Sequence, residues 1–167
     1  MKKLIKLFFI IVVLFSSVAI CAQPIEKWRI AQLEEYIKQS DKPLIVNFWA
    51  TFCKPCVEEI PYFQALTKKY EKEGIKLLLV SLDLKEAYPK IKDFAVKHQF
   101  RAPIVYLNET NADIFCPKVD EKWSGAIPAS LFVNNQTGYR KFFEEQIPEK
   151  KLEEEIKALT ANKKPLR

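Results

Sequence analysis

Residues 44–50, LIVNFWA, form a short apolar run that only Asn47 interrupts. A run of this length and composition is typical of a β-strand covered on both faces, because a surface helix would be longer and would mix apolar with polar positions. After this run the apolar residues follow helical spacing, at Cys56, Ile60, Phe63, Leu66 and Tyr70, and Gly74 ends the pattern. A buried strand followed by an amphipathic helix indicates an α/β protein.

The same alternation of strands and helices continues along the 167 residues. We expect helices at 25–39, at 90–99 and from Pro148 onward, a helical turn from Asn111 that carries Cys116, and strands at 75–82, 103–107, 129–133 and 139–143. Turn residues between the last two strands make them a hairpin. This order predicts a single α/β domain, with a central mixed β-sheet and helices on both faces.

The first part of the chain differs in composition from the rest. Three lysines precede an apolar run at 7–22, a pattern typical of a signal peptide at residues 1–22 that is cleaved on export. A lipid anchor at Cys21 and an uncleaved membrane anchor are the alternatives. All three place the domain, residues 23–167, in the periplasm or elsewhere outside the cytoplasm, where disulfides persist.

The net charge does not indicate a nucleic-acid partner. The formal charge is +6, and removal of residues 1–22 takes away three lysines and no acidic residue, which leaves about +3. A chain that binds nucleic acid usually carries a stronger and more clustered positive charge.

Cys53 and Cys56 lie at the junction between the predicted strand and the predicted helix. The first turn of a helix has unpaired amide groups and the positive end of the helix dipole, and both stabilise a thiolate. Lys54 adds positive charge, whereas Pro55 removes one amide donor and fixes the backbone. We therefore expect Cys53 to be the nucleophile and Cys56, one turn deeper, to be the resolving thiol. Glu59, on the same helix face, is the candidate base, and an ordinary solvated carboxylate is the alternative.

Two other interpretations of the cysteine pair are weaker. A zinc site needs about four ligands, and outside the pair the mature chain offers only Cys116 and His98. A disulfide that closes so short a loop constrains the unfolded chain little, so a purely structural bridge is also disfavoured. A CxxC motif between a buried strand and an amphipathic helix of an exported domain favours thiol–disulfide chemistry. We expect no metal and no other cofactor.

Two stretches resemble a known family. Residues 46–61, VNFWATFCKPCVEEIP, are similar to the active-site segment of the exported TlpA/ResA-like thiol–disulfide oxidoreductases, and GAIPASLFV at 125–133 is similar to their cis-proline loop. The residues that match in register are Asn47, Phe48, Trp49, Ala50, Cys53, Cys56, Glu59, Pro61 and Pro128. The resemblance implies a thioredoxin-like fold and a redox-active Cys53–Cys56 disulfide. It also implies a cis bond at Pro128 and a substrate segment that pairs with the backbone of Ile127.

The resemblance also implies partners for this chemistry. The substrates would be protein disulfides, including that of apocytochrome c in cytochrome c biogenesis, and a membrane-embedded thiol donor would supply electrons. We expect Trp49, Phe52, Lys54 and Pro55 to line the surface that meets the substrate, with packing around the site as the other interpretation of Trp49. We expect the protein to be a monomer.

Three departures from the family pattern affect the details. Asn47 stands where cytoplasmic thioredoxins have a buried aspartate, which favours Glu59 as the substitute proton acceptor. Phe52 replaces the tryptophan usual before the first cysteine. Many members begin with a β-hairpin, whereas this chain is predicted to begin with the helix at 25–39.

Cys116 gives the mature chain an odd number of cysteines. The simpler interpretation is a buried free thiol that behaves as a small apolar residue. The alternative hypothesis is that Cys116 borders the active site and forms a disulfide with Cys53 or with a partner. His98 is expected at a helix end or on the surface, and Trp123 is expected to pack around the site.

The leading functional hypothesis is an exported disulfide reductase, and two alternatives remain. A peroxiredoxin-like peroxidase would need a threonine and an arginine beside one cysteine; Thr51 is near, but no arginine lies between Arg29 and Arg101. A copper or thiol assembly chaperone would be expected to use histidine or methionine ligands, and the mature chain has only His98 and no methionine. The redox potential would decide whether the protein acts as reductase, oxidase or isomerase.

Overall fold

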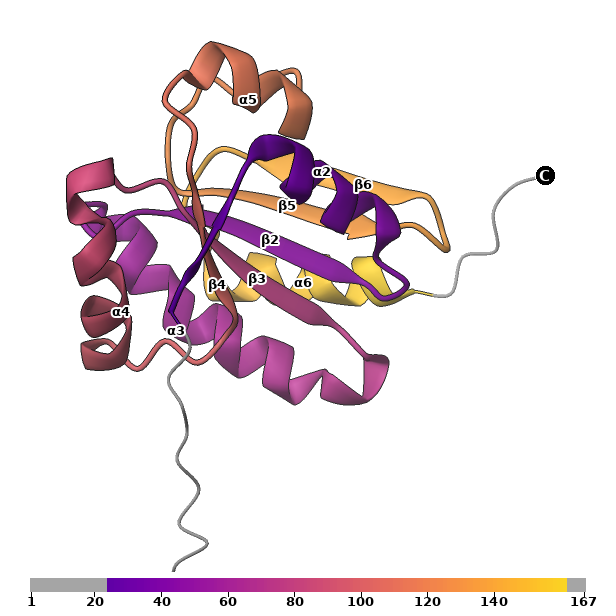
Figure 1. Ribbon diagram of the computed structural model, residues 1–167. Coiled ribbons are helices and arrows are strands. Elements are labelled where there is room, and N and C mark those ends of the chain that lie inside the picture. The colour runs from indigo at the N-terminus through magenta and orange to yellow at the C-terminus, as the bar shows by residue number, and fades with distance from the viewer. Residues whose placement is uncertain (1–23, 162–167) are drawn as a thin grey trace, which may run out of the picture.

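The computed structural model describes residues 24–161 (Figure 1). The elements in chain order are β1 (Glu26–Trp28), α2 (Ile30–Gln39), β2 (Leu44–Trp49), α3 (Lys54–Lys69), the 3-10 turn η1 (Glu71–Glu73), β3 (Lys76–Ser81), the 3-10 turn η2 (Lys85–Ala87), α4 (Tyr88–Lys97), β4 (Ile104–Leu107), α5 (Ala112–Val119), β5 (Ala129–Asn134), β6 (Tyr139–Phe143) and α6 (Glu149–Thr160). The predicted signal peptide at 1–22 lies outside the described residues. Within the described part, no helix combines the length and the apolar character that crossing a membrane requires.

The strands form one mixed sheet in the order β1-β4-β3-β2-β5-β6. The first four are mutually parallel, while β5 runs antiparallel to β2 and forms a hairpin with β6. In this register Phe48 near the end of β2 is opposite Ala129 at the start of β5. The loop before β5 therefore lies beside the end of β2, where the CxxC segment begins.

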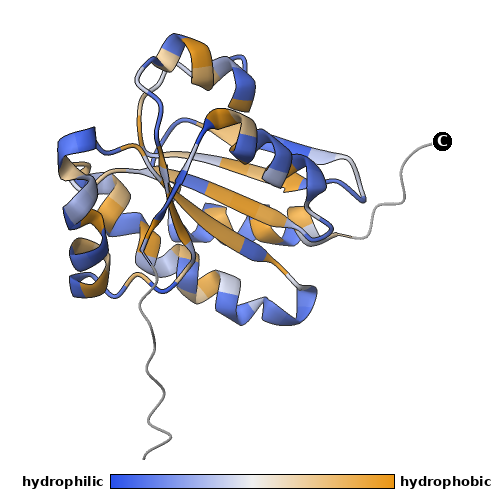
Figure 2. Ribbon diagram, in the orientation of Figure 1, coloured by the Kyte–Doolittle hydropathy of each residue, from blue (hydrophilic) through white to orange (hydrophobic). Residues whose placement is uncertain are grey.

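Helices cover both faces of the sheet, as the sequence predicts. On one face α3, α4 and α6 pack through residues such as Phe63, Ile91 and Ile156 onto the alternate side chains of the strands. On the other face α2 and α5 pack through Leu33 and Phe115. Every residue of β2 is buried, which explains its nearly uniform apolar sequence, and Figure 2 shows the hydrophobic central strands between helices that carry hydrophilic outer residues.

The predicted helix at 25–39 is wrong in its first part. Residues 26–28 instead form β1, the edge strand that pairs in parallel with β4. Arg29 is extended and its guanidinium donates to the carbonyl of Asn108 at 2.6 Å, so the helix begins only at Ile30. β1 is a strand because it pairs with β4, about 80 residues away, and such pairing leaves no periodic pattern in the sequence of residues 26–28. The helical pattern of the residues that follow was therefore extended over them. The other predicted strands and helices are confirmed, with ends shifted by one or two residues.

Candidate active site

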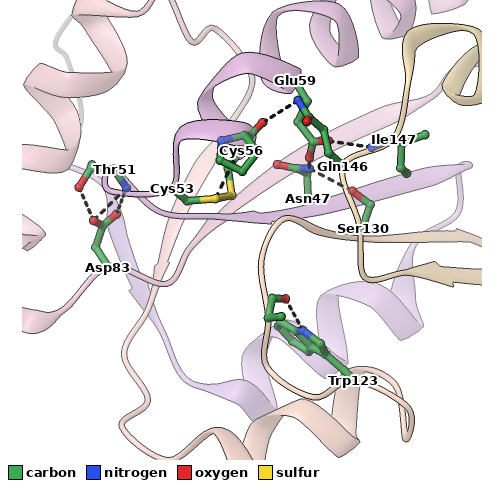
Figure 3. Close-up of a disulfide and its surroundings, with 12 residues drawn as sticks. Asn47, Thr51, Cys53, Cys56, Glu59, Asp83, Trp123, Ser130, Gln146 and Ile147 are labelled. Atoms are coloured by element: carbon green, nitrogen blue, oxygen red, sulfur yellow. Dashed lines mark hydrogen bonds between the residues drawn. A yellow bond between two sulfur atoms is a disulfide. The ribbon is translucent and has the colours of Figure 1, made fainter.

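The cysteine pair lies where the sequence places it, between β2 and α3. Cys53 is the N-cap of α3, and Cys56 lies in its first turn with Pro55 before it. The two residues form a disulfide with a Cα–Cα distance of 5.3 Å (Figure 3). The Cys53 Sγ accepts a hydrogen bond from the Cys56 amide at 3.3 Å, because Pro55 has no amide hydrogen to offer. The helix N-terminus thus directs a donor at the sulfur of Cys53.

Burial distinguishes the two cysteines. Cys53 retains 7% of its surface and Cys56 retains none. The greater exposure of Cys53 agrees with an outer nucleophile and an inner resolving thiol. Cys53 is nevertheless less exposed to solvent than its position before the helix suggests.

Glu59 is buried, so the solvated-carboxylate interpretation is wrong. Its carboxylate accepts hydrogen bonds from the Asn47 Nδ2 at 2.7 Å and from the Ile147 amide at 3.1 Å. Asn47 Nδ2 also donates to the Ser130 hydroxyl at 3.0 Å, so Asn47 links Glu59 in α3 to Ser130 in β5. Burial raises the pKa of Glu59 from 4.5 to about 7, against the opposing effect of the two hydrogen bonds. A carboxyl group with such a pKa can accept and release a proton near neutral pH.

Asp83 is a residue of the site that sequence reasoning missed. It is buried two residues after the end of β3 and accepts hydrogen bonds from the amide and the hydroxyl of Thr51, at 3.0 and 2.5 Å, and from the hydroxyl of Ser81 at 2.8 Å. These bonds attach the loop between β2 and α3 to the neighbouring strand (Figure 3). Two polar residues, Ser81 and Asp83, where the apolar strand ends are the signal that could have identified it.

The loop before β5 contains the expected cis-proline. The Ile127–Pro128 peptide bond is cis, and Pro128 is buried. Ile127 packs against the same core cluster that contains Cys53 and Cys56. Within the described residues, neither the amide nor the carbonyl of Ile127 has a hydrogen-bond partner. The backbone of Ile127 is thus free for an external strand.

The four residues expected to line the substrate surface around the cysteines differ in how exposed they are. Trp49 is fully buried and packs edge-on against Phe100, with ring centroids 5.2 Å apart, so its assignment to the substrate surface is wrong. The last residue of β2 points into the core because every side chain of this central strand is covered. Phe52 is 69% exposed, and Lys54 is exposed and pairs with a glutamate of its own helix. Pro55 is half-buried beside them.

Cys116 is a buried free thiol, as the simpler interpretation holds. It belongs to the core on the α2 and α5 side of the sheet, whereas Cys53 and Cys56 belong to the core on the other side. The sheet therefore separates Cys116 from Cys53, and the hypothesis of a disulfide between them is wrong. Burial, with a smaller contribution from the Glu144 charge, raises the pKa of Cys116 to about 11.

Trp123 packs around the site and His98 ends a helix. Trp123 is buried against Phe48, and its indole donates to the Ala126 carbonyl at 2.9 Å in the loop before the cis bond. His98 is the C-cap of α4 and stacks on Phe94. Both placements agree with the structural roles expected from the sequence.

The arginines of the described part lie away from Cys53. Arg29 bonds to the segment after β4, and Arg140 donates to the Val119 carbonyl. Arg101 precedes β4, at the amino-terminal end of the parallel strands. The cysteines follow β2, at the opposite, carboxyl-terminal end. The described residues also contain no group of three or more histidine, cysteine or acidic side chains able to hold a metal ion.

The sequence matches one family model and is similar to two curated proteins. The model of the AhpC/TSA family matches residues 20–138. The thiol-disulfide oxidoreductase ResA of Bacillus cereus (strain ZK / E33L) is 35% identical over 63 residues, which are 38% of this chain and 35% of that protein. ResA of Oceanobacillus iheyensis is 38% identical over 64 residues, 34% of this chain and 33% of that protein. The similarity thus spans about a third of the length of these curated relatives.

Solved structures with low identity share the fold. A thioredoxin-related protein from Neisseria meningitidis serogroup B superposes with a TM-score of 0.63 at 24% identity, over 74% of this chain and 88% of that chain. A thiol:disulfide interchange protein of the thioredoxin family from Chlorobium tepidum TLS gives a TM-score of 0.60 at 18% identity, over 77% and 85%. A thioredoxin-like fold, as expected from the sequence, is thereby confirmed.

Proposed function

We propose that this chain, which belongs to the AhpC/TSA family, is a thiol–disulfide oxidoreductase that reduces disulfides in other proteins with its own dithiol, as its similarity to ResA supports. The observation that carries this proposal is the Cys53–Cys56 pair at the first turn of α3, with the buried carboxyl group of Glu59 one turn further along the same helix. A helix N-terminus favours the thiolate that thiol–disulfide exchange requires.

The reaction begins with the reduced pair and a disulfide in the target. The thiolate of Cys53 attacks one target sulfur, so that a mixed disulfide forms and the other target sulfur leaves as a thiolate. Cys56 then loses its proton and attacks the Sγ of Cys53, which breaks the mixed disulfide. The target gains two electrons and becomes a dithiol, and the protein is left with the Cys53–Cys56 disulfide.

Glu59 is the proposed acceptor of the Cys56 proton. It lies three residues after Cys56 in α3, and both residues are fully buried. Since burial raises the pKa of Glu59 to about 7, the ionised and protonated forms are both populated near neutral pH. The proton of Cys56 would pass to Glu59 directly or through one water molecule.

The substrate surface is proposed to combine Phe52 with the backbone of Ile127. Phe52 presents an exposed aromatic ring directly before Cys53. The unpaired amide and carbonyl of Ile127 can add an extended target segment by strand pairing. Lys54 and Pro55 lie in the first turn of α3, where they would contact the segment that carries the target disulfide.

We propose that the protein works outside the cytoplasm, most simply in a periplasm. The basic and apolar sequence of residues 1–22 supports export, and one structural neighbour is described as a secreted disulfide oxidoreductase of Mycobacterium tuberculosis. The resemblance of residues 46–61 to the TlpA/ResA-like family is the basis for proposing apocytochrome c as one target and a membrane-embedded thiol donor as the source of electrons. No further cofactor enters the proposed reaction.

An insulin-reduction assay tests the activity. The wild-type protein, supplied with dithiothreitol, should accelerate precipitation of the insulin B chain, and Cys53→Ser should abolish the acceleration. Cys56→Ser should accumulate a mixed disulfide with the target, visible on a non-reducing gel. Activity that survives Cys53→Ser would reject the proposal. Equilibration in glutathione buffers would then give the redox potential and the direction of electron flow.

A further inference from the structure

Glu144, directly after β6, holds the loop that precedes the cis bond. One carboxylate oxygen of Glu144 accepts three hydrogen bonds, from the Ser124 amide at 3.0 Å, the Ser124 hydroxyl at 2.5 Å and the Ala126 amide at 2.9 Å. Burial alone would raise the pKa of Glu144, but these donors outweigh it and the pKa lies below its usual value. The group is therefore an ionised acceptor at neutral pH, and hydrogen bonds to it are charge-assisted.

In this loop Ala126 is the last residue whose backbone is hydrogen-bonded, and Ile127, the proposed substrate-pairing residue, follows it. The amide of Ala126 is taken by Glu144, and its carbonyl accepts from the indole of Trp123 at 2.9 Å. The next residue, Ile127, keeps both backbone groups unpaired within the described residues. Fixing Ala126 on both sides therefore fixes the peptide plane that presents the amide of Ile127.

The residues after Glu144 contact the other wall of the site. Gln146 donates to the carbonyl of Pro55 at 3.3 Å, and Ile147 donates to Glu59 (Figure 3). The segment 144–147 is thus bonded to the loop before the cis-proline at one end and to the CxxC helix at the other. The segment therefore connects the loop before the cis-proline with the N-terminus of α3, and a target would lie between these two surfaces.

We propose that Glu144 is a positioning residue that orders residues 124–126, so that the backbone of Ile127 is ready to pair with a polypeptide substrate. This inference rests on the proposed disulfide reductase activity. Without the carboxylate the loop would have to be ordered at the moment of binding, which weakens substrate affinity while the cysteine chemistry stays intact. A disulfide without a peptide backbone would gain nothing from the ordered loop.

Single-turnover kinetics with two substrates test this role. The reduced protein is mixed with a short peptide that carries one internal disulfide, or with 2-hydroxyethyl disulfide, and oxidation is followed over a range of concentrations. For Glu144→Ala we expect the half-saturation concentration for the peptide to rise about tenfold, with the limiting rate, the redox potential and the rate with the small disulfide unchanged. Glu144→Gln, which keeps a neutral acceptor, should recover most of the affinity.

Glu145→Ala is the matched control, because Glu145 is exposed and, among the described residues, pairs with Lys151 at the surface. It should behave as wild type with both substrates. An unchanged half-saturation concentration in Glu144→Ala, an equal loss with both disulfides, or a Glu144→Gln variant as weak as Glu144→Ala would overturn the inference.

Amide hydrogen exchange separates this inference from the proposed function. The amides of Ser124 and Ala126 should be protected in the wild type and should lose protection in Glu144→Ala, whether or not the protein reduces disulfides. Unprotected amides in the wild type would refute the positioning role alone, whereas protected amides in a protein inactive with both substrates would refute the proposed function alone.

Discussion

Replacement of Glu59 by glutamine should remove a pH dependence from the stability of the protein. In the folded chain burial raises the pKa of Glu59 from 4.5 to about 7, whereas in the unfolded chain the group is solvated and ionises at its ordinary pKa. Between these two values the folded state keeps a proton that the unfolded state has released. The stabilising contribution of the protonated carboxyl is therefore complete below about pH 4.5 and is lost as the pH rises through about 7.

The magnitude follows from the pKa difference. One pKa unit corresponds to about 1.36 kcal/mol, so the difference between 4.5 and about 7 amounts to about 3 kcal/mol in total. Integrated between about pH 5 and about pH 8, the free energy of unfolding of the wild type should fall by about 2.5 kcal/mol through this group alone. The glutamine cannot accept from both Asn47 and Ile147, but this cost is about 1 to 3 kcal/mol and independent of pH.

The assay is urea unfolding of the oxidised wild type and of Glu59→Gln at several pH values across this range. The stability of the wild type relative to the variant should decrease by about 2.5 kcal/mol from the acid to the alkaline end. Other titrating groups are common to both proteins and cancel in the difference. Glu58→Gln, a change of the exposed neighbour, is the control: because it keeps Glu59, its stability should still fall as the pH rises across this range. A constant difference between wild type and Glu59→Gln would refute the raised pKa and, with it, the reason for choosing Glu59 as the base.

Two further predictions concern Asp83 and Cys116. Asp83→Ala should leave the amide and hydroxyl of Thr51 and the hydroxyl of Ser81 without their buried acceptor, at a cost of about 2 to 4 kcal/mol measured by chemical unfolding; an unchanged stability would contradict the role assigned to it. Since burial raises the pKa of Cys116 to about 11, iodoacetamide should leave this thiol unmodified in the folded protein near pH 8 and modify it after denaturation. Mass spectrometry of a Cys21→Ser variant would detect the difference, and rapid labelling of the native protein would contradict the buried placement.

The sequence predicts the elements whose cause is local. The apolar run of β2 and the helical stripe of α3 are periodic patterns, so the junction that carries Cys53 and Cys56 follows directly from them. The turn residues 134–138 likewise predict the β5–β6 hairpin. The edge strand β1 was missed because only its pairing with the distant β4 makes it a strand.

The burial of Glu59 could not be predicted in the same way. Spacing along α3 places it near the face of Cys56, but its partners Asn47 and Ile147 lie 12 and 88 residues away in the chain. The roles of Asp83 and Glu144 depend in the same manner on contacts with Thr51, 32 residues away, and Ser124, 20 residues away. No periodic pattern records such contacts.

The amino-acid sequence by itself therefore determined the α/β architecture and the thiol pair at a helix N-terminus, because short-range patterning encodes both. The cis bond at Pro128 was expected only because residues 125–133 resemble the cis-proline loop of a known family. Only the tertiary structure decided how these parts work together. Folding removes Glu59 from water and so sets its pKa near 7, places Cys116 behind the sheet, and fixes the loop before Ile127 through Glu144. The physical reason is that desolvation and long-range hydrogen bonds arise only when segments distant in the chain are packed together.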